Sequence, residues 1–312
     1  MDNRKLISIT SPCFNEEANV EELYRRVSKV MEGIPEFDFE YIFIDNASTD
    51  GTGEILRNLA KKESRVKVIF NTRNFGHIRS PYWGILQSSG DATIYLASDL
   101  QDPPEKIPEF IKEWEKGWKV VLGVKPESQT NRLSHKLRLG YYKFLDRITD
   151  INIIKHATGF GLYDAVVLNE LRKINDPYPF LRGLISELGY PVKQVSFVQP
   201  ARIHGVTKNN FFTLYDIAML GIVNHSLFPI RVAAFSGIFL GFISLILAFI
   251  VVIFKFLYWN SFPLGSIPLI LGVLLMLGVN LIFIGLLGEY VANILAHVRG
   301  RPIVVESERI NF

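Results

Sequence analysis

The sequence predicts an α/β domain followed by a hairpin of two membrane-spanning helices. Short strand-like runs alternate with helical runs through residues 6–124, and two long uncharged apolar runs lie near the C-terminus. Nearly all Asp and Glu residues precede position 220. The 312 residues are enough for one sizeable soluble domain and a membrane segment.

The expected strands are short, rich in β-branched and aromatic residues, and bounded by turn residues. They are Leu6–Ser11, Tyr41–Asp45, Val66–Phe70, Ala92–Leu96 and Lys119–Val124. The helices expected between them have a helical spacing of apolar residues; they are Asn19–Glu32, Thr52–Lys62, Arg79–Ser89 and Glu105–Lys116. This alternation predicts a mostly parallel sheet covered on both faces, with ligands bound at the carboxyl ends of its strands.

Two apolar runs, Val232–Phe254 and Ile267–Gly288, each exceed the roughly 18–20 residues that cross a bilayer as a helix. A buried core helix is the alternative, and two such runs in tandem make it improbable. Basic residues flank the outer ends of the pair, with Arg231 before it and Arg299 and Arg301 after it. The positive-inside rule then places the large domain and both termini in the cytoplasm, on a plasma membrane of bacterial inner-membrane type.

The chain divides into four expected parts. Residues 1–210 form the soluble domain, 211–229 a juxtamembrane segment, 230–290 the hairpin and 291–312 a cytoplasmic tail. The segment Phe211–Phe228 is apolar but interrupted by polar residues, which favours a helix in the membrane interface. A core helix of the soluble domain is an equal alternative for its first half. Glycines in the spans, such as Gly237 and Gly285, allow close helix approach, so a homo-oligomer is plausible.

Several function classes are excluded. The net charge of +3 gives no reason to expect a nucleic-acid partner. Cys13 is the single cysteine, so neither an internal disulfide nor a Cys-rich zinc site is possible. The N-terminus lacks the apolar stretch of a signal peptide. The chain contains no GxxxxGK[ST], GxGxxG, HExxH or GxSxG sequence, which argues against NTPases, dinucleotide dehydrogenases, zincins and serine hydrolases.

Polar and acidic segments follow three of the expected strands: Ser11–Glu17, Asp45–Thr52 and Ala97–Pro104. Each alone could be an ordinary turn or helix cap. All three together place carboxylates at one edge of a parallel sheet. Such an edge suits a hard divalent cation, which prefers oxygen ligands and shares them with substrate phosphates.

The order of these segments resembles the family 2 glycosyltransferases of GT-A fold. The matching residues are P-x-F-N-E from Pro12, D-x-x-S-x-D-G-T from Asp45, R-N-F-G from Arg73, S-D-L-Q-D-P-P from Ser98, and R-I-H-G-V-T-K from Arg202. More narrowly, the chain resembles the polyisoprenyl-phosphate glycosyltransferases, which include dolichol-phosphate mannose synthases and bacterial enzymes that load sugars onto undecaprenyl phosphate. The resemblance extends into the hairpin and covers nearly the whole chain.

The resemblance implies a cytoplasmic inverting transferase that uses a nucleotide sugar. UDP-glucose is our first choice of donor, and UDP-GlcNAc, UDP-galactose and GDP-mannose are the alternatives. It implies that Pro12, Phe14, Glu16, Asp45, Ser98 and Asp99 bind the nucleotide sugar. Asp99 and Gln101 would bind Mg²⁺ or Mn²⁺, which stabilises the nucleoside diphosphate as it leaves. Asp99, Arg202 and Lys208 would form the catalytic set.

The implied acceptor is a polyprenyl phosphate. A phosphate monoester has a second pKa of about 6 and is already a nucleophile at neutral pH, so the acceptor needs a cationic cradle more than a general base. The candidates are Lys125, Arg132, Lys136, Arg138, Arg202 and Lys208. Some of them lie on an expected helix, Asn131–Thr149, where a solvated basic face is the alternative interpretation.

The chain departs from the family pattern at three positions. Ala97 and Asn46 stand where relatives often have acidic residues, and Gly140 stands where they commonly have Ser. Metal binding could therefore be weaker, or Asp102 could substitute. The main alternative is an inactive membrane-anchored nucleotide-sugar-binding protein. A processive polysaccharide synthase would need a Q-x-x-R-W motif and more spans, and a transporter would usually carry ionisable groups within its spans.

Overall fold

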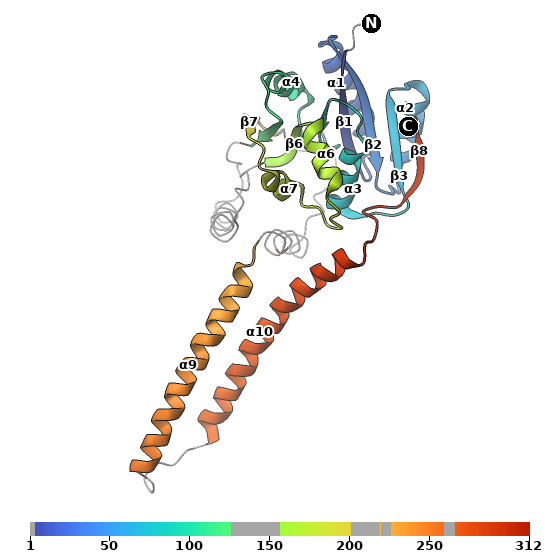
Figure 1. The fold of residues 1–312 in the computed structure, drawn as a ribbon. Helices are drawn as coiled ribbons and strands as arrows, with labels where there is room; N and C mark the ends of the chain where they lie inside the picture. The colour runs from blue at the N-terminus through green and yellow to red at the C-terminus, as the bar shows by residue number, and fades with distance from the viewer. Residues whose placement is uncertain (1–3, 126–156, 201–218, 220–225, 259–265) are drawn as a thin grey trace.

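The computed structural model describes residues 4–125, 157–200, 219, 226–258 and 266–312. The expected helix Asn131–Thr149 and most of the expected interfacial segment Phe211–Phe228 lie outside these residues. The described part forms an α/β domain with two long helices extending from one end (Figure 1). The predicted α/β class is confirmed.

An eight-stranded mixed sheet forms the centre of the domain, in the order β7-β5-β6-β4-β1-β2-β3-β8. The strands are β1 (Lys5–Cys13), β2 (Phe37–Asp45), β3 (Val66–Asn71), β4 (Ala92–Tyr95), β5 (Val120–Val124), β6 (Ala157–Asp164), β7 (Val192–Ser196) and β8 (Glu306–Ile310). Strands β3, β2, β1 and β4 are parallel, whereas β6 runs antiparallel to both β4 and β5. The carboxyl ends of β1, β2 and β4 therefore meet at one edge.

Helices cover both faces of the sheet, because their apolar sides pack on its buried side chains. On one face lie α1 (Val20–Glu32), α2 (Thr52–Lys62) and α4 (Ile107–Glu115), the last preceded by the 3₁₀ turn η1 (Pro104–Lys106). On the other lie α3 (Gly76–Leu86), α6 (Ala165–Lys173) and α7 (Leu181–Leu188). The expected helix Arg79–Ser89 begins three residues earlier than predicted, at Gly76.

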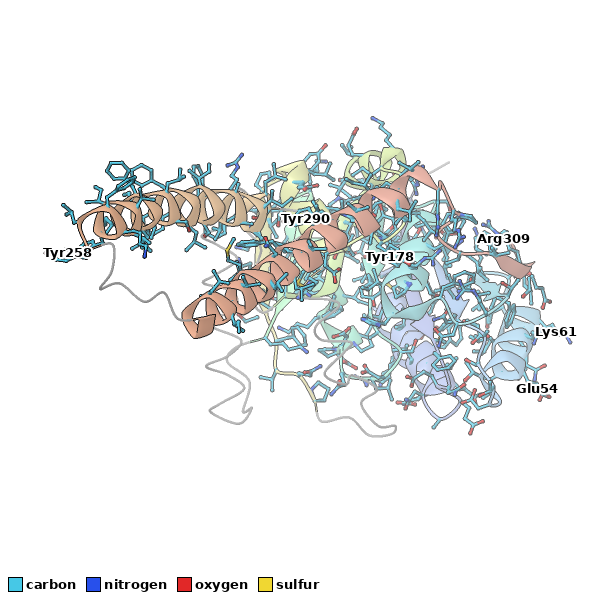
Figure 2. All side chains as sticks on the ribbon, turned by 90° about the horizontal axis from the view of Figure 1, so that it is seen from below. Glu54, Lys61, Tyr178, Tyr258, Tyr290 and Arg309 are labelled. Carbon is cyan, nitrogen blue, oxygen red and sulfur yellow. The ribbon has the colours of Figure 1, made fainter. Side chains whose placement is uncertain are left out.

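The two long helices are α9 (Phe228–Leu257) and α10 (Ser266–Val298). Both are long and apolar enough to cross a membrane, and almost none of their most apolar stretches is buried within the protein. Tyr258 lies at the tip of α9 that is remote from the domain, and Tyr290 lies nearer the domain (Figure 2). The Tyr290 hydroxyl donates a 2.7 Å hydrogen bond to the carbonyl oxygen of Ser226, which joins the two helices at their domain end.

The C-terminus differs from the expected tail. Helix α10 continues ten residues past the expected span, to Val298, and the chain then returns to the domain. Ile303 and Val304 are buried beside α3, and β8 pairs antiparallel with β3. The last residues of the chain thus form the edge strand of the sheet that the first residues begin (Figure 1).

Candidate functional site

The loops after β1 and β2 are joined by side chain–backbone hydrogen bonds. The Asn15 amide N–H donates to Ser48 Oγ at 2.9 Å, and the Thr49 N–H donates back to Asn15 Oδ1 at 2.8 Å. The Glu16 N–H donates to Thr52 Oγ1 at 2.8 Å. These reciprocal contacts join the two loops. The parallel pairing of β1 and β2 predicts that the loops lie side by side, because it places the carboxyl ends of both strands at the same edge.

Each of the three site loops contains a non-glycine residue in the left-handed region of φ. These residues are Asn15 (φ 58°), Ala47 (φ 60°) and Leu100 (φ 60°). Such conformations cost free energy and persist where the surrounding structure enforces them, often at functional sites. Their presence in all three loops supports a common function for this edge of the sheet.

Ser98 connects the loop after β4 to the loop after β1. Its hydroxyl donates a 2.7 Å hydrogen bond to the Pro12 carbonyl oxygen and lies 3.1 Å from Cys13 Sγ. Ser98 and Cys13 are buried, whereas Pro12 and Phe14 are half-buried. Ser98 therefore positions the backbone beside Asp99. The Ser98 hydroxyl already donates its hydrogen bond within the protein.

Carboxylates gather around the end of β1. Burial raises the pKa of the Cys13 thiol, and the negative charges of Asp45, Glu16 and Asp50 raise it further. Burial also raises the pKa of Asp45, against the opposing effect of hydrogen bonds from Ser48. Three of the acidic residues that follow β1 and β2 thus share one small, electronegative region.

A second acidic pair follows β4. Asp99 is half-buried, and its Oδ1 accepts a 3.2 Å hydrogen bond from the Gln101 N–H. Asp102 is buried, and its Oδ2 accepts a 3.0 Å hydrogen bond from the Ala97 N–H. Burial first, and then the charge of Asp99, raises the pKa of Asp102 to about 6, while the positive charge of Lys125 opposes the rise. Asp99, Asp102 and Lys125 therefore interact electrostatically.

These groups fit a divalent cation that is shared with a substrate. Among the residues that the structure describes, no three His, Cys, Asp or Glu side chains form a complete metal site. Mg²⁺ is commonly held by one or two carboxylates together with substrate phosphates. Asp99 has the exposure for such a role, and Gln101, also half-buried, carries a neutral amide oxygen two residues later. Asp102 is buried and accepts a hydrogen bond from the Ala97 N–H, so Asp99 is the more accessible of the two carboxylates.

Asn46, one of the departures from the family pattern, lies inside the protein. Its Nδ2 donates to Asn74 Oδ1 at 2.8 Å, and its Oδ1 accepts from the Phe75 N–H at 2.8 Å and from Asn71 Nδ2 at 3.1 Å. An amide supplies both the donor and the acceptor that these contacts need. Asn46 thus holds the Arg73–Gly76 segment in place.

The structure brings together the predicted nucleotide-sugar and metal residues: Pro12, Phe14, Glu16, Asp45, Ser98, Asp99 and Gln101. Lys125 follows the last residue of β5 at the same edge and interacts with Asp102. Arg132, Lys136, Arg138, Arg202 and Lys208 lie outside the described residues, so their roles stay predictions. Of the three predicted catalytic residues, Asp99 is described by the structure, whereas Arg202 and Lys208 lie outside the described residues.

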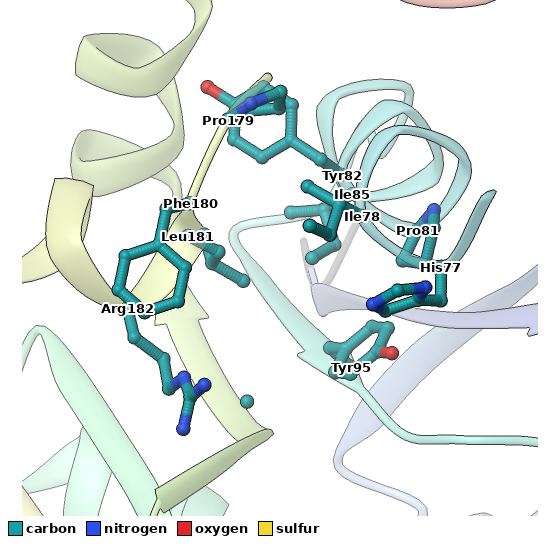
Figure 3. A pocket seen from close by; sticks show the side chains of 11 residues that line it. His77, Ile78, Pro81, Tyr82, Ile85, Tyr95, Pro179, Phe180, Leu181 and Arg182 are labelled. Carbon is teal, nitrogen blue, oxygen red and sulfur yellow. The ribbon is translucent and has the colours of Figure 1, made fainter. Parts of the chain in front are cut away.

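A pocket of about 170 Å³ beside the acidic edge was not predicted from the sequence. One side is formed by α3, including Ile78 and Tyr82, and the other by the segment Pro179–Arg182 (Figure 3). Tyr95, the last residue of β4, lies at its base, and its pKa is raised by burial and by the nearby charges of Asp102 and Asp99. No local pattern identifies this pocket, because its walls come from segments about a hundred residues apart.

Comparison with known proteins supports the resemblance. The family model described as "Glycosyl transferase family 2" matches residues 8–172. The chain is 33% identical over 309 residues to the "SfII prophage-derived bactoprenol glucosyl transferase" of Shigella flexneri, covering 98% of this chain and 99% of that one. It is also 33% identical to "Uncharacterized glycosyltransferase YkcC" of Bacillus subtilis, covering 96% of this chain and 92% of that one.

The domain also resembles solved structures. One is glucosyl-3-phosphoglycerate synthase from Mycobacterium tuberculosis in complex with Mn²⁺, UDP and phosphoglyceric acid. The similarity has a TM-score of 0.48 at 20% identity, and it covers 70% of this chain and 76% of that one.

Proposed function

The chain belongs to glycosyl transferase family 2, and we propose that it transfers a sugar from a nucleotide sugar to polyprenyl phosphate at the cytoplasmic surface of a membrane. The observation that carries this proposal is that hydrogen bonds join the loop after β1 to the loops after β2 and β4, at the edge of the sheet where Asp99 follows β4. The bactoprenol glucosyl transferases among its relatives support the acceptor class and glucose as the first sugar to test. UDP-glucose is therefore the favoured donor.

In the proposed reaction, an oxygen of the acceptor phosphate attacks C1 of the sugar. The bond between C1 and the donor's phosphate oxygen breaks, and the nucleoside diphosphate leaves. A bound Mg²⁺ or Mn²⁺ would stabilise the charge that develops on that diphosphate. Asp99 and Gln101 would hold the cation. The loops carrying Asp45 and Glu16 are fixed to one another, which suits binding of the ribose and base at the end of β1 and β2.

The acceptor phosphate is largely dianionic at neutral pH and needs no dedicated general base. Cationic side chains would position it and reduce its repulsion from the donor. Lys125, which follows β5 at the same edge of the sheet, would belong to this cradle, and Arg132, Lys136, Arg138, Arg202 and Lys208 would complete it. We keep Arg202 and Lys208 as proposed catalytic residues because they lie within the segment that resembles the family.

Membrane anchoring forms part of the proposal. The apolar side chains of α9 and α10 are largely exposed along both helices, which is unfavourable in water and favourable in lipid. Anchoring would raise the local concentration of an acceptor whose phosphate lies at the membrane surface. Open space beside glycines such as Gly237 and Gly285 leaves room for a second copy of the hairpin.

The test uses the purified full-length protein in detergent, with undecaprenyl phosphate and a panel of radiolabelled nucleotide sugars. We expect a lipid-linked monosaccharide, a requirement for a divalent cation, and loss of at least about 100-fold in rate for Asp99→Ala, since a ligand to the leaving group is removed. Asp38→Ala is the control, because Asp38 is an exposed residue of β2 paired with Arg4 at 3.7 Å. Nucleotide binding without transfer from any donor would instead support the inactive binding protein.

A further inference from the structure

The pocket beside Tyr95 is mostly apolar and extends inward between two helices (Figure 3). Ile85 and Tyr82 of α3 form its deep side and are almost fully buried. Phe180 and Leu181, at the start of α7, face them across the space (Figure 3). A space with this lining suits a hydrocarbon group. It is less suited to a sugar ring, whose several hydroxyls would lose hydrogen bonds to water there.

The position of the pocket follows the order of the strands. The loops proposed to hold the nucleoside end β2 and β1, and the proposed metal ligands follow β4, the next strand. Tyr95 of β4 and Gly159 of β6 line one side of the pocket, and α3, which packs on β1 and β2, lines another, so the pocket lies on the α3 face of the sheet next to the loop of the proposed metal ligands. In an inverting displacement the acceptor oxygen approaches C1 of the sugar from the face opposite the leaving diphosphate, so a pocket beside this loop lies close to where the acceptor must bind.

A positive charge lies at one side of the pocket. Arg182 lines it, and its guanidinium donates a 3.0 Å hydrogen bond to the Ala157 carbonyl oxygen. That acceptor is neutral, and among the residues that the structure describes no carboxylate forms an ion pair with Arg182, whose guanidinium also lies 5.1 Å from the Phe180 ring centroid. An apolar cavity with a guanidinium beside it is complementary to an apolar chain that ends in a phosphate.

The segment that forms this wall is also tied to the membrane-facing helix. Asp176, just before the wall, lies 3.5 Å from His297 near the end of α10. Arg79 of α3 donates a 2.6 Å hydrogen bond to the Pro302 carbonyl oxygen, and its guanidinium lies 5.5 Å from the Tyr178 ring centroid. The pocket therefore lies between the acidic edge of the sheet and the end of a helix proposed to cross the bilayer.

The pocket volume limits the size of the occupant. A cavity of about 150 Å³ lined by Leu, Ile and Phe binds benzene, a group of six carbons. The volume of about 170 Å³ is thus enough for a group of five or six carbons. One isoprene unit has five.

We propose that this pocket binds the isoprene unit attached to the phosphate of the lipid acceptor. The inference rests on the proposed function, because it assumes a polyprenyl phosphate acceptor. Arg182 contacts the phosphate end of that unit, and Leu181 and Phe180 contact its methyl branch and chain.

The first test fills the pocket. Leu181→Trp, assayed in the full-length protein, is expected to raise the KM for undecaprenyl phosphate at least about 10-fold and to leave the KM for the nucleotide sugar unchanged. Leu181→Ala should raise the acceptor KM severalfold, by removing contacts. Leu188→Ala is the matched control: it removes the same atoms from the other end of α7, outside the pocket, and should leave both KM values unchanged. An unchanged donor KM also shows that each variant is folded.

The second test changes the acceptor. Farnesyl phosphate and dodecyl phosphate have main chains of equal length, but only the first has a branched, unsaturated unit next to the phosphate. The wild type should prefer farnesyl phosphate, and Leu181→Trp should remove the preference. The proposal would be overturned if Leu181→Trp kept the acceptor KM and the acceptor preference of the wild type. It would also be overturned if Leu181→Trp raised only the KM for the nucleotide sugar, because the pocket would then bind the sugar.

Failure of the proposed function gives a different result. If the wild type transfers no sugar to any polyprenyl phosphate, calorimetry of farnesyl phosphate with the full-length protein in detergent still tests the pocket. Binding by the wild type and Leu188→Ala, with loss in Leu181→Trp, supports the inference. Equal binding by the wild type and both variants, or no binding by the wild type, overturns it.

Discussion

The side-chain amide of Asn311 donates a 2.8 Å hydrogen bond to the carbonyl oxygen of Val66, so the next-to-last residue of the chain closes the start of β3. The same amide donates a second 2.8 Å hydrogen bond to the Ala60 carbonyl oxygen in α2. Asn311 also has a φ of 62°, a conformation that Asn tolerates better than most residues. The contact fixes the edge strand β8, and through it the end of α10, to the domain.

We expect Asn311→Ala to lower the free energy of unfolding by about 1–3 kcal/mol, because two half-buried hydrogen bonds are lost and the left-handed backbone is less favourable for Ala. Thermal unfolding of the full-length protein in detergent measures the effect. Glu308→Gln is the control in the same strand. Its 2.7 Å pair with Arg57 is well exposed, so it should contribute less than about 1 kcal/mol. Equal losses in the two variants would contradict this account.

Glu40 is a buried acid on β2 whose charge is satisfied within the protein. Burial raises the pKa of its carboxyl, but an ion pair with Lys67 at 2.6 Å and hydrogen bonds from Ser8 and Ser89 outweigh burial, so the pKa lies below its usual value. A lowered pKa in the folded state means that the charged form stabilises the fold. That stabilisation is present above the unfolded-state pKa and is lost as the pH falls through the folded-state pKa.

Glu40→Gln should therefore lower the free energy of unfolding by about 2 kcal/mol at pH 7, because Lys67 loses its partner. The difference from the wild type should shrink as the pH falls below about 4.5, the ordinary range of Glu. Unfolding measured from pH 7 to pH 3.5 checks this. A difference that stays constant across the range would show that packing, and not charge, explains the loss.

The elements that the sequence predicted are those set by local patterns. The alternation of β-branched and helical runs gave β1 to β5 and the helices between them, and the acidic turns gave Asp45 and Asp99. Strand β8 was not predicted, because its residues Glu306–Ile310 include three charged side chains and acquire a strand conformation only beside β3. The pocket was not predicted, because its walls meet only in the tertiary fold.

The environments of Ala97 and Asn46 also could not be predicted from local sequence patterns. From the sequence, both are positions where an acidic ligand is missing. In the structure, Asn46 is buried and hydrogen-bonded inside the protein, whereas Ala97 is half-buried beside Asp99. The two departures therefore have different physical meanings, and two substitutions distinguish them.

Ala97→Asp should strengthen metal binding. A third carboxylate beside Asp99 and Asp102 increases the negative charge that attracts a divalent cation. We expect the Mg²⁺ concentration for half-maximal transfer to fall severalfold, with little change in the maximal rate. Titration of chelator-treated enzyme with Mg²⁺ measures this, with Asp38→Ala as a control that changes charge far from the site. An unchanged Mg²⁺ requirement would show that the side chain at position 97 does not face the cation.

Asn46→Asp should instead damage the protein. The Nδ2 that donates to Asn74 Oδ1 and to the Gly76 carbonyl oxygen becomes a negatively charged acceptor that faces those two acceptors. We expect a loss of at least about 2 kcal/mol in the free energy of unfolding and no decrease in the Mg²⁺ requirement. Asn169→Asp makes the same chemical change at an exposed position, where the side-chain oxygen accepts from Arg172, and should cost less than about 0.5 kcal/mol. A stable Asn46→Asp variant that needs less Mg²⁺ would identify position 46 as part of the cation site.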